Sequence, residues 1–350
     1  MQKQHFLALD GLRGLAAIAI VVFHFMEWIF PQFEDNVIGH GFLAVDFFFC
    51  LSGFVMGYAY DDRLKTMSLG KFFVMRLIRL QPLVIIGSVL GLIGLLWAPY
   101  SAVEPKSISQ YLQLFIYSIL LIPYPVLEEK AFNLFSLNAP AWSLFWEYVA
   151  NVVYALVLVR VTAKHLLSIA IVAAMALVYV GYSYGNLAGG WSIDNWEVGG
   201  IRLAYSFCAG LLLYRRQWII RHRLSYLVPV LLLSLALLMP FTALNWLVES
   251  LIVLFLFPLI VALGAGTNTP KAVQPLSNFL GAISYPLYMT HYAAIWIFGD
   301  YLQSDAFQEE HLPFVVIGGS VGLLLFAYII MKVIDIPVRK YLTNRFLRIT

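Results

Sequence analysis

Charge is the feature that this sequence has least of. Only 12% of its 350 residues are Asp, Glu, Lys or Arg, whereas 61% are hydrophobic. Soluble proteins carry about twice that share of charged residues, so a soluble globular fold is excluded. The two cysteines, Cys50 and Cys208, lie in apolar runs without metal-like spacing, which argues against a disulfide framework and a zinc site. We expect no bound metal and no nucleic-acid partner, and we expect membrane lipids around the chain.

The apolar residues gather in windows near the length that crosses the core of a bilayer, about 20 residues. A shorter apolar piece, residues 111–122, is predicted to be a re-entrant or interfacial helix within the loop 100–141. We therefore predict an all-α, polytopic transmembrane bundle that forms a single domain over residues 1–350. Its ten spans are predicted at 12–30, 42–60, 80–99, 142–160, 165–183, 199–216, 224–241, 246–265, 282–299 and 314–335.

Charge placement predicts the direction of these helices. If the N-terminus is cytoplasmic and residues 111–122 do not cross, all 22 lysines and arginines except Lys106, Lys130 and Arg202 lie on the cytoplasmic side. Membrane proteins carry such an excess of Lys and Arg in their cytoplasmic loops. A crossing at residues 111–122 would invert every later loop and remove this bias. We therefore predict that the N- and C-termini are both cytoplasmic.

Polar residues of three predicted helices lie at one depth in the outer half of the membrane. The helical rise of about 1.5 Å per residue places His24 level with Asp46 and Glu147. Glu249 and Arg202 enter from the same side and lie shallower. Charged groups in hydrocarbon seek one another or water, so we expect a shared cavity that serves chemistry or transport. Histidine is the side chain best suited to take up a proton near neutral pH.

A second polar layer is predicted at the inner face. Asp10 and Arg13 begin the first helix, and Arg76 and Arg79 are three residues apart on one helical face. Guanidinium groups suit phosphate. Eleven residues separate Arg13 from His24, or about 16 Å along a helix axis, which is comparable to the extended pantetheine arm of coenzyme A. A nucleotide held by these arginines would present a thioester to His24.

The ionisable residues of both layers also have structural interpretations. A histidine can pack between helices, a carboxylate can pair with an arginine or cap a helix, and an arginine can anchor a helix at the cytoplasmic face. These interpretations stay open for His24, Asp46, Glu147, Asp10, Arg13, Arg76, Arg79 and His291.

Five blocks of the sequence, taken in order, resemble one known family. The blocks are LDGLRGLAAIAIVVFHF, GFLAVDFFFCLSGFVM, RLIRLQP, APAWSLFWEYVANVVY and ISYPLYMTHY, which extend over residues 9–292. They are similar to the acyltransferase-3 family of integral membrane proteins, which O-acylate sugars and other hydroxyl compounds in bacteria. The resemblance implies a multi-pass protein of the bacterial inner (cytoplasmic) membrane. Two departures are modest: Cys50 replaces a branched aliphatic residue, and the bulky Trp146 adjoins Glu147.

The resemblance also implies roles for the matched residues. His24 matches the general base of the family, and Arg76 and Arg79 match its paired arginines, which are associated with acyl-CoA. Arg13 and Asp10 match the arginine of the first block and the acid before it, and we group both with the acyl-CoA site. We assign acceptor or substrate binding to four further residues of the matched blocks: Asp46, Ser52, Trp142 and His291.

These observations predict transfer of an acyl group, most simply acetyl from acetyl-CoA, to a hydroxyl of a carbohydrate, a lipid-linked sugar or a secondary metabolite. His24 would remove the hydroxyl proton, and Glu147 would orient its imidazole. Acyl-CoA is expected as a donor substrate, with no permanently bound cofactor. Transfer of the acyl group across the bilayer is a further hypothesis. A proton-coupled transporter or a glycolipid flippase is the alternative, although such proteins more often show repeats and broken helices, and the sequence predicts neither.

Overall fold

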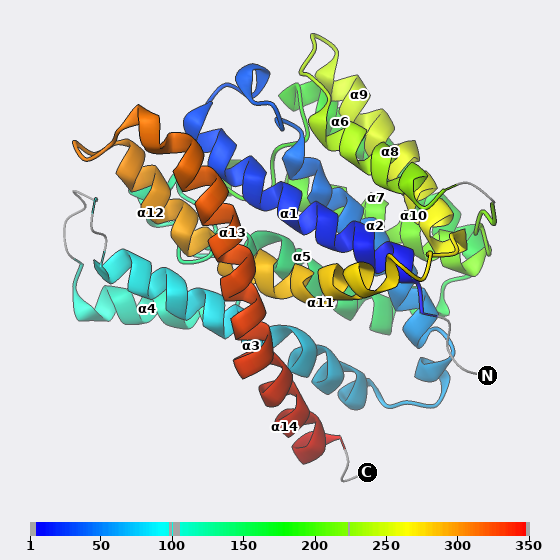
Figure 1. Ribbon diagram of the computed structural model, residues 1–350. Helices are drawn as coiled ribbons and strands as arrows, with labels where there is room; N and C mark the ends of the chain where they lie inside the picture. Colours follow the sequence, from blue (N-terminus) through cyan, green and yellow to red (C-terminus); the bar gives the residue numbers. More distant parts are fainter. Residues whose placement is uncertain (1–4, 98–99, 101–105, 223–224, 348–350) are drawn as a thin grey trace.

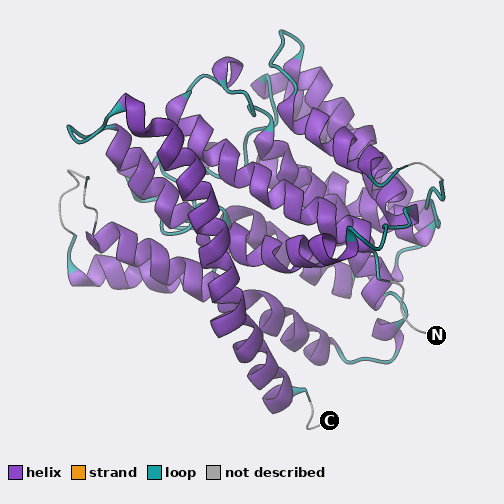
Figure 2. Cartoon of the chain, viewed as in Figure 1, coloured by secondary structure: helices purple, strands orange, loops and turns teal. Residues whose placement is uncertain are grey.

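The protein folds almost entirely into helices (Figure 1). The structure is a computed structural model that describes residues 5–97, 100, 106–222 and 225–347. Within these ranges the only β-type pairing is an isolated bridge between Asn133 and Ser192, and Figure 2 shows helices joined by loops. The chain therefore has the all-α architecture that its composition predicts.

The described residues form fourteen α-helices, named here in chain order, and two of them continue through a π-helical turn. The first seven are α1 (Leu7–Ile29), α2 (Ala44–Tyr60), α3 (Leu69–Trp97), α4 (Ile108–Ile119), α5 (Ala141–Leu156), α6 (Ala163–Tyr184) and α7 (Trp196–Arg215). The others are α8 (Leu227–Leu238), α9 (Asn245–Leu251), α10 (Phe257–Gly266), α11 (Gln274–Thr290), α12 (Tyr292–Leu302), α13 (Leu312–Ile330) and α14 (Ile336–Phe346). The π-helical turns are Ile252–Leu256, between α9 and α10, and Met331–Asp335, between α13 and α14.

Two close helix pairs build the centre of the bundle. Helix α1 runs along α11, and α2 runs along α7 (Figure 1). Glycine permits the second pair, because a Cβ atom at Gly210 of α7 would lie 1.8 Å from the carbonyl oxygen of Cys50 in α2. In return, a Cβ at Gly53 would lie 2.0 Å from the carbonyl oxygen of Phe207. Small residues allow this close packing where helices meet within a membrane.

Six helical stretches among the described residues are long and apolar enough to cross a membrane: Leu7–Ile29, Gly41–Tyr60, Leu69–Trp97, Ala163–Tyr184, Asn245–Gly266 and Glu309–Phe346. The predicted count of ten spans stays a prediction. Two predicted spans are shorter as helices, since α5 has 16 residues and α8 has 12. Residues 98–99 and 224, at the ends of two predicted spans, lie outside the described residues.

The prediction of one continuous helix over residues 282–299 is wrong. The chain forms α11 up to Thr290, bends at His291 and continues as α12. The expectation that no helix is broken in mid-course is therefore also wrong. Hydropathy alone does not reveal such a bend, because both halves are apolar.

The short apolar piece predicted at residues 111–122 corresponds to α4, which has 12 residues and packs beside α3. Ser107 caps its N-terminus by accepting a hydrogen bond from the backbone N–H of Gln110. At about 1.5 Å per residue, α4 is about 18 Å long and cannot cross a bilayer core. This length agrees with a re-entrant or interfacial position.

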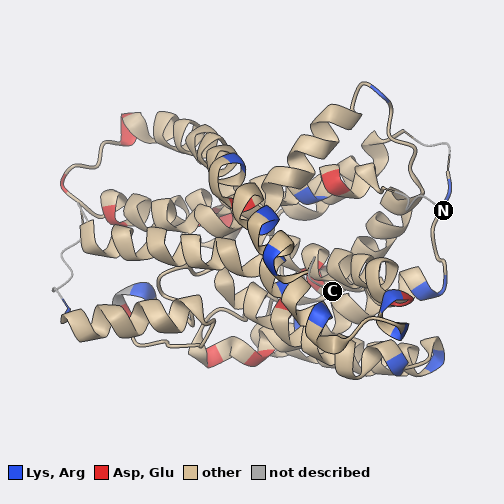
Figure 3. Ribbon diagram, turned by 90° about the horizontal axis from the view of Figure 1, so that it is seen from below, with Lys and Arg blue, Asp and Glu red and all other residues tan. Residues whose placement is uncertain are grey.

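Figure 3 shows that most lysines and arginines lie toward the half of the molecule that holds both termini. The opposite end carries mainly acidic residues, along with a few basic ones. The cytoplasmic position of both termini stays a prediction from this asymmetry. Lys3, Arg223 and Arg348, which the prediction also counts as cytoplasmic, lie outside the described residues.

Candidate active site

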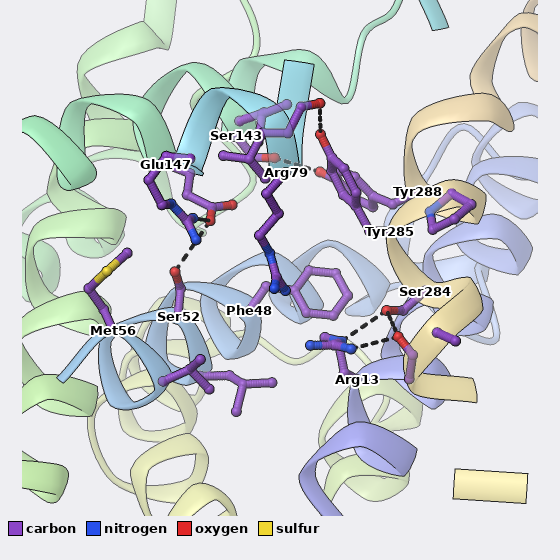
Figure 4. A pocket seen from close by; sticks show the side chains of 18 of the residues that line it. Arg13, Phe48, Ser52, Met56, Arg79, Ser143, Glu147, Ser284, Tyr285 and Tyr288 are labelled. Carbon is purple, nitrogen blue, oxygen red and sulfur yellow. Dashed lines mark hydrogen bonds and ion pairs between the residues drawn. The ribbon is translucent and has the colours of Figure 1, made fainter. Parts of the chain in front are cut away.

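A cavity of about 390 Å³ lies inside the bundle, at the end where α1 begins and α2 ends. Helices α1, α2, α3, α5, α11 and α14 all contribute side chains to its wall (Figure 4). Its volume lies within the range of small-molecule sites. The lining is unusual in being rich in arginine, as Arg13, Arg76, Arg79 and Arg339 all reach it.

Arg13 is fixed against α11. Its Nε donates to Ser284 Oγ at 2.9 Å, and its Nη2 donates to the carbonyl oxygen of Gly281 at 2.6 Å. Asp10, one turn earlier on α1, lies 3.1 Å from the same guanidinium and also accepts from His5. The sequence predicted the proximity of Asp10 and Arg13, and the structure shows that Asp10 balances the charge of Arg13.

Arg76 is fixed against α5. Its Nη2 donates to Glu147 Oε1 at 2.8 Å, and the Ser52 hydroxyl lies 3.5 Å from the same oxygen. The Arg76 side chain is only 8% exposed, and its Nε has no hydrogen-bond partner among the described residues. Glu147 and Ser52 thus lie in the arginine-rich cavity, where Glu147 balances the charge of Arg76.

Arg79 differs from its neighbours because no described residue pairs with it. Its side chain extends to the middle of the cavity and is exposed there (Figure 4). A guanidinium group presents a planar fork of N–H donors that matches phosphate. Arg79 therefore offers a complete set of donors to an anionic ligand, whereas Arg13 and Arg76 are partly engaged.

His24 forms a separate polar centre on α1. It lies about 16 Å from Arg13 along the helix axis. Its Nδ1 lies 2.7 Å from Glu27 Oε1, one turn later on the same helix. Because an ionised carboxylate can only accept, this contact places a proton on Nδ1 and leaves Nε2 free to take one. The ring stacks on His291 at 5.3 Å and meets the edge of Tyr292 at 4.8 Å.

The predicted grouping of His24, Asp46 and Glu147 in one shared cavity is wrong. Glu147 belongs to the arginine cavity, and the carboxylate beside His24 is Glu27. The prediction used depth along each helix and had no information on the direction in which each side chain points. The spacing of His24 and Glu27, three residues apart on one helix, was the available signal for the correct partner.

His24 does not line the arginine cavity, and aromatic rings lie between the two. Phe48 and Tyr288 line the cavity and contact each other edge to face, with ring centroids 5.8 Å apart. Tyr288 is held by Ser143, whose hydroxyl lies 2.7 Å from the phenol oxygen. Beyond Tyr288 lies His291 at 6.1 Å, and then His24. We refer to Phe48 and Tyr288 below as the aromatic wall.

Asp46 and Trp142 lie away from the cavity and pack around Arg202. Arg202 Nη2 donates to Asp46 Oδ2 at 2.5 Å, and its Nε reaches both carboxylate oxygens at 3.1 and 3.2 Å. The guanidinium also lies over the Trp142 ring, at 5.4 Å from its centroid. Asp46 and Arg202 are both essentially inaccessible to solvent. This geometry suits helix pairing, which was the alternative interpretation of Asp46.

His291, the last residue assigned to substrate binding, is fully buried at the bend between α11 and α12. Its Nδ1 lies 3.0 Å from the carbonyl oxygen of Leu287, and its Nε2 has no partner among the described residues. Within the described chain, no group of three or more His, Cys, Asp or Glu side chains is arranged to hold a metal ion.

Comparison with known proteins agrees with this architecture. The sequence model of the acyltransferase-3 family, described as an acyltransferase domain, matches residues 6–332. The chain is 35% identical over 188 residues to "Protein 2 in picA locus" of Rhizobium radiobacter, an alignment that covers 50% of this chain and 94% of that protein. No solved structure matches it with significance. The chain belongs to the acyltransferase-3 family, and its membrane-length helices make it a membrane acyltransferase.

Proposed function

We propose that the protein transfers an acyl group, most simply acetyl, from acyl-CoA to a hydroxyl of a carbohydrate or other envelope acceptor. The arrangement that carries the proposal is the cavity in which Arg13, Arg76 and Arg79 converge. Acyl-CoA carries its negative charge on phosphates at one end and its reactive thioester at the other. A cavity lined by arginines and by apolar side chains such as Phe48 suits both parts of this molecule.

In this proposal the arginines hold the donor in two ways. Arg13 and Arg76 are oriented by Ser284 and Glu147 and bind phosphate through their remaining N–H groups. Arg79 has no competing partner among the described residues and supplies the strongest single contact. The pantetheine arm then runs along α2 past Ser52 toward the aromatic wall. With both termini cytoplasmic, the donor enters from the cytoplasm of a bacterial inner membrane.

The chemical step is a proton transfer coupled to attack on the thioester. Nε2 of His24 takes the proton of the acceptor hydroxyl while its oxygen bonds to the thioester carbonyl carbon. The carbon–sulfur bond then breaks, and the thiolate of CoA receives the proton from His24. Glu27 holds Nδ1 and stabilises the imidazolium that forms between these events. The thioester reaches His24 by displacement of the Phe48 side chain from the aromatic wall.

The acceptor approaches from the opposite side of the wall. The side chains of His24 and Glu27 are 18% and 27% exposed, so this centre is accessible without passage through the arginine cavity. Separate approaches for donor and acceptor favour transfer across the membrane. A transporter or flippase receives no support from the family match.

The test is release of CoA from acetyl-CoA by the purified protein in the presence of a hydroxylated envelope extract. We expect release by the wild type, and loss of release with retained CoA binding in His24→Ala. The matched control is His165→Ala, because His165 lies at the exposed start of α6 and does not line the arginine cavity or contact His24. Equal release by His24→Ala and the wild type would contradict His24 as the base. Absence of release from the wild type would contradict acyl transfer.

A further inference from the structure

The C-terminal helix contributes to the wall of the arginine cavity, although it lies beyond the segment that matches the family model. The family match ends at residue 332. The chain then completes the π-helical turn Met331–Asp335 and continues as α14. Asp335, Ile336 and Arg339 of this segment line the cavity together with Met331. The wall of the cavity therefore includes residues beyond the matched segment.

The π-helical turn sets the position of the polar residues in this segment. A π-helical turn widens the helix by one residue and is frequent at functional sites. Here the turn ends at Asp335, which is only 2% exposed, and Arg339 follows one turn further along. Arg339 Nη2 donates to Asp335 Oδ2 at 2.8 Å. Arg339 is thus held at the cavity by a buried carboxylate.

Each member of this pair also has hydrogen-bonding capacity that no described residue uses. Asp335 Oδ1 and Arg339 Nε are buried and without a partner. A buried polar group that lacks a partner costs free energy, and it indicates a ligand or water that completes the site. The described lining holds four arginines, including Arg79, against the carboxylates Glu147 and Asp335, so the cavity favours an anion.

We propose that Arg339 binds a phosphate at the nucleotide end of acyl-CoA and that Asp335 is its positioning residue. This inference rests on the proposed function and adds α14 to the donor site. The thioester end points toward the aromatic wall, so the nucleotide end lies where α1 begins and α14 passes. The N–H groups of Arg339 that Asp335 does not engage supply the planar fork that suits phosphate oxygens.

The experiment measures CoA affinity of the purified full-length protein by titration calorimetry. Loss of one charge-assisted contact is expected to raise the Kd of Arg339→Gln about tenfold. Arg345→Gln is the matched control, because Arg345 lies on the same helix and does not line the cavity. We expect its Kd to equal that of the wild type. Titration of 3′-dephospho-CoA identifies the phosphate: a loss confined to CoA assigns the 3′-phosphate, and an equal loss for both assigns the pyrophosphate.

A double-substitution cycle tests the role of Asp335. Asp335→Asn is expected to raise the Kd several-fold in the wild-type background and to have no further effect in Arg339→Gln, since a positioning residue acts through its partner. Independent, additive losses would contradict that role. If Arg339→Gln melts at a lower temperature than the wild type, the CoA affinity of Arg339→Lys is measured instead. Lysine keeps the positive charge but lacks the planar fork of N–H donors. An affinity of Arg339→Lys that remains at the wild-type value would then overturn the proposal.

The outcomes separate the two proposals. Wild-type binding of CoA together with unchanged binding by Arg339→Gln would overturn the inference about α14 and leave the proposed function standing. Failure of the wild type itself to bind CoA would overturn the proposed function.

Discussion

Substitution of Asp46 by Asn distinguishes a structural carboxylate from one that binds the acceptor. Asp46 and Arg202 are buried together, and the carboxylate makes three contacts with one guanidinium. The amide introduced by Asp46→Asn would remove the negative charge and leave Arg202 positive in an apolar interior. Arg202 would keep its hydrogen bonds to the carbonyl oxygens of Gly189 and Phe42, which are neutral. The main loss is therefore the ionic partner.

The magnitude follows from the burial of both groups. Removal of one partner from a buried ion pair costs about 3–5 kcal/mol, because the remaining charge is uncompensated. Folded proteins are stable by only about 5–15 kcal/mol, so Asp46→Asn is expected to remove a large part of the stability. A substitution of both residues by apolar ones, Asp46→Leu with Arg202→Met, removes the unpaired charge and is expected to restore most of it.

The assay is thermal unfolding of the detergent-solubilised protein, with acyl transfer measured in parallel. Asp46→Asn is expected to melt well below the wild type, and the apolar double variant is expected to melt close to it. The control Asp62→Asn removes the partner of Lys65 in an exposed pair and is expected to leave the melting temperature unchanged. A normal melting temperature for Asp46→Asn, together with loss of transfer, would refute this reasoning and support acceptor binding by Asp46.

Three further predictions concern the aromatic wall, the base and the helix packing. Phe48→Ala is expected to raise the rate of CoA release from longer acyl-CoA chains relative to acetyl-CoA. An unchanged dependence of the rate on chain length would contradict the role of Phe48 in the aromatic wall. Glu27→Gln is expected to lower kcat about tenfold or more at an unchanged KM for acetyl-CoA, because His24 loses the carboxylate that stabilises its cation; a change in KM alone would argue against this. Gly210→Ala is expected to lower the melting temperature strongly, since its Cβ would meet a backbone carbonyl at 1.8 Å, whereas Gly318→Ala has open space and should not.

Composition and charge placement predict much of the architecture, because they indicate which segments lie in the bilayer and which lie in water. The low charge content and the long apolar runs require helices in a bilayer. They do not reveal where an apolar helix bends, as at His291, or where a helix continues beyond its apolar part, as from α13 into α14. Both features depend on packing and backbone geometry, which leave the hydropathy unchanged.

The site residues also divide into those whose position the sequence predicts and those whose position depends on packing. Arg13, Arg76 and Arg79 meet in one cavity, which the common depth of these residues and their affinity for phosphate had suggested. The partner of His24 was misjudged, because depth along a helix does not give the direction of a side chain. Glu27 lies on the same helix and one turn away, where local spacing alone brings the two groups together.

The central claim is that one molecule of acyl-CoA extends from the arginine cavity toward His24. The most direct measurement is an experimental structure of the protein with bound CoA. The account predicts phosphate groups in contact with Arg79 and the thiol at the aromatic wall of Phe48 and Tyr288. A nucleotide bound outside the cavity, or a thiol that points away from this wall, would contradict it.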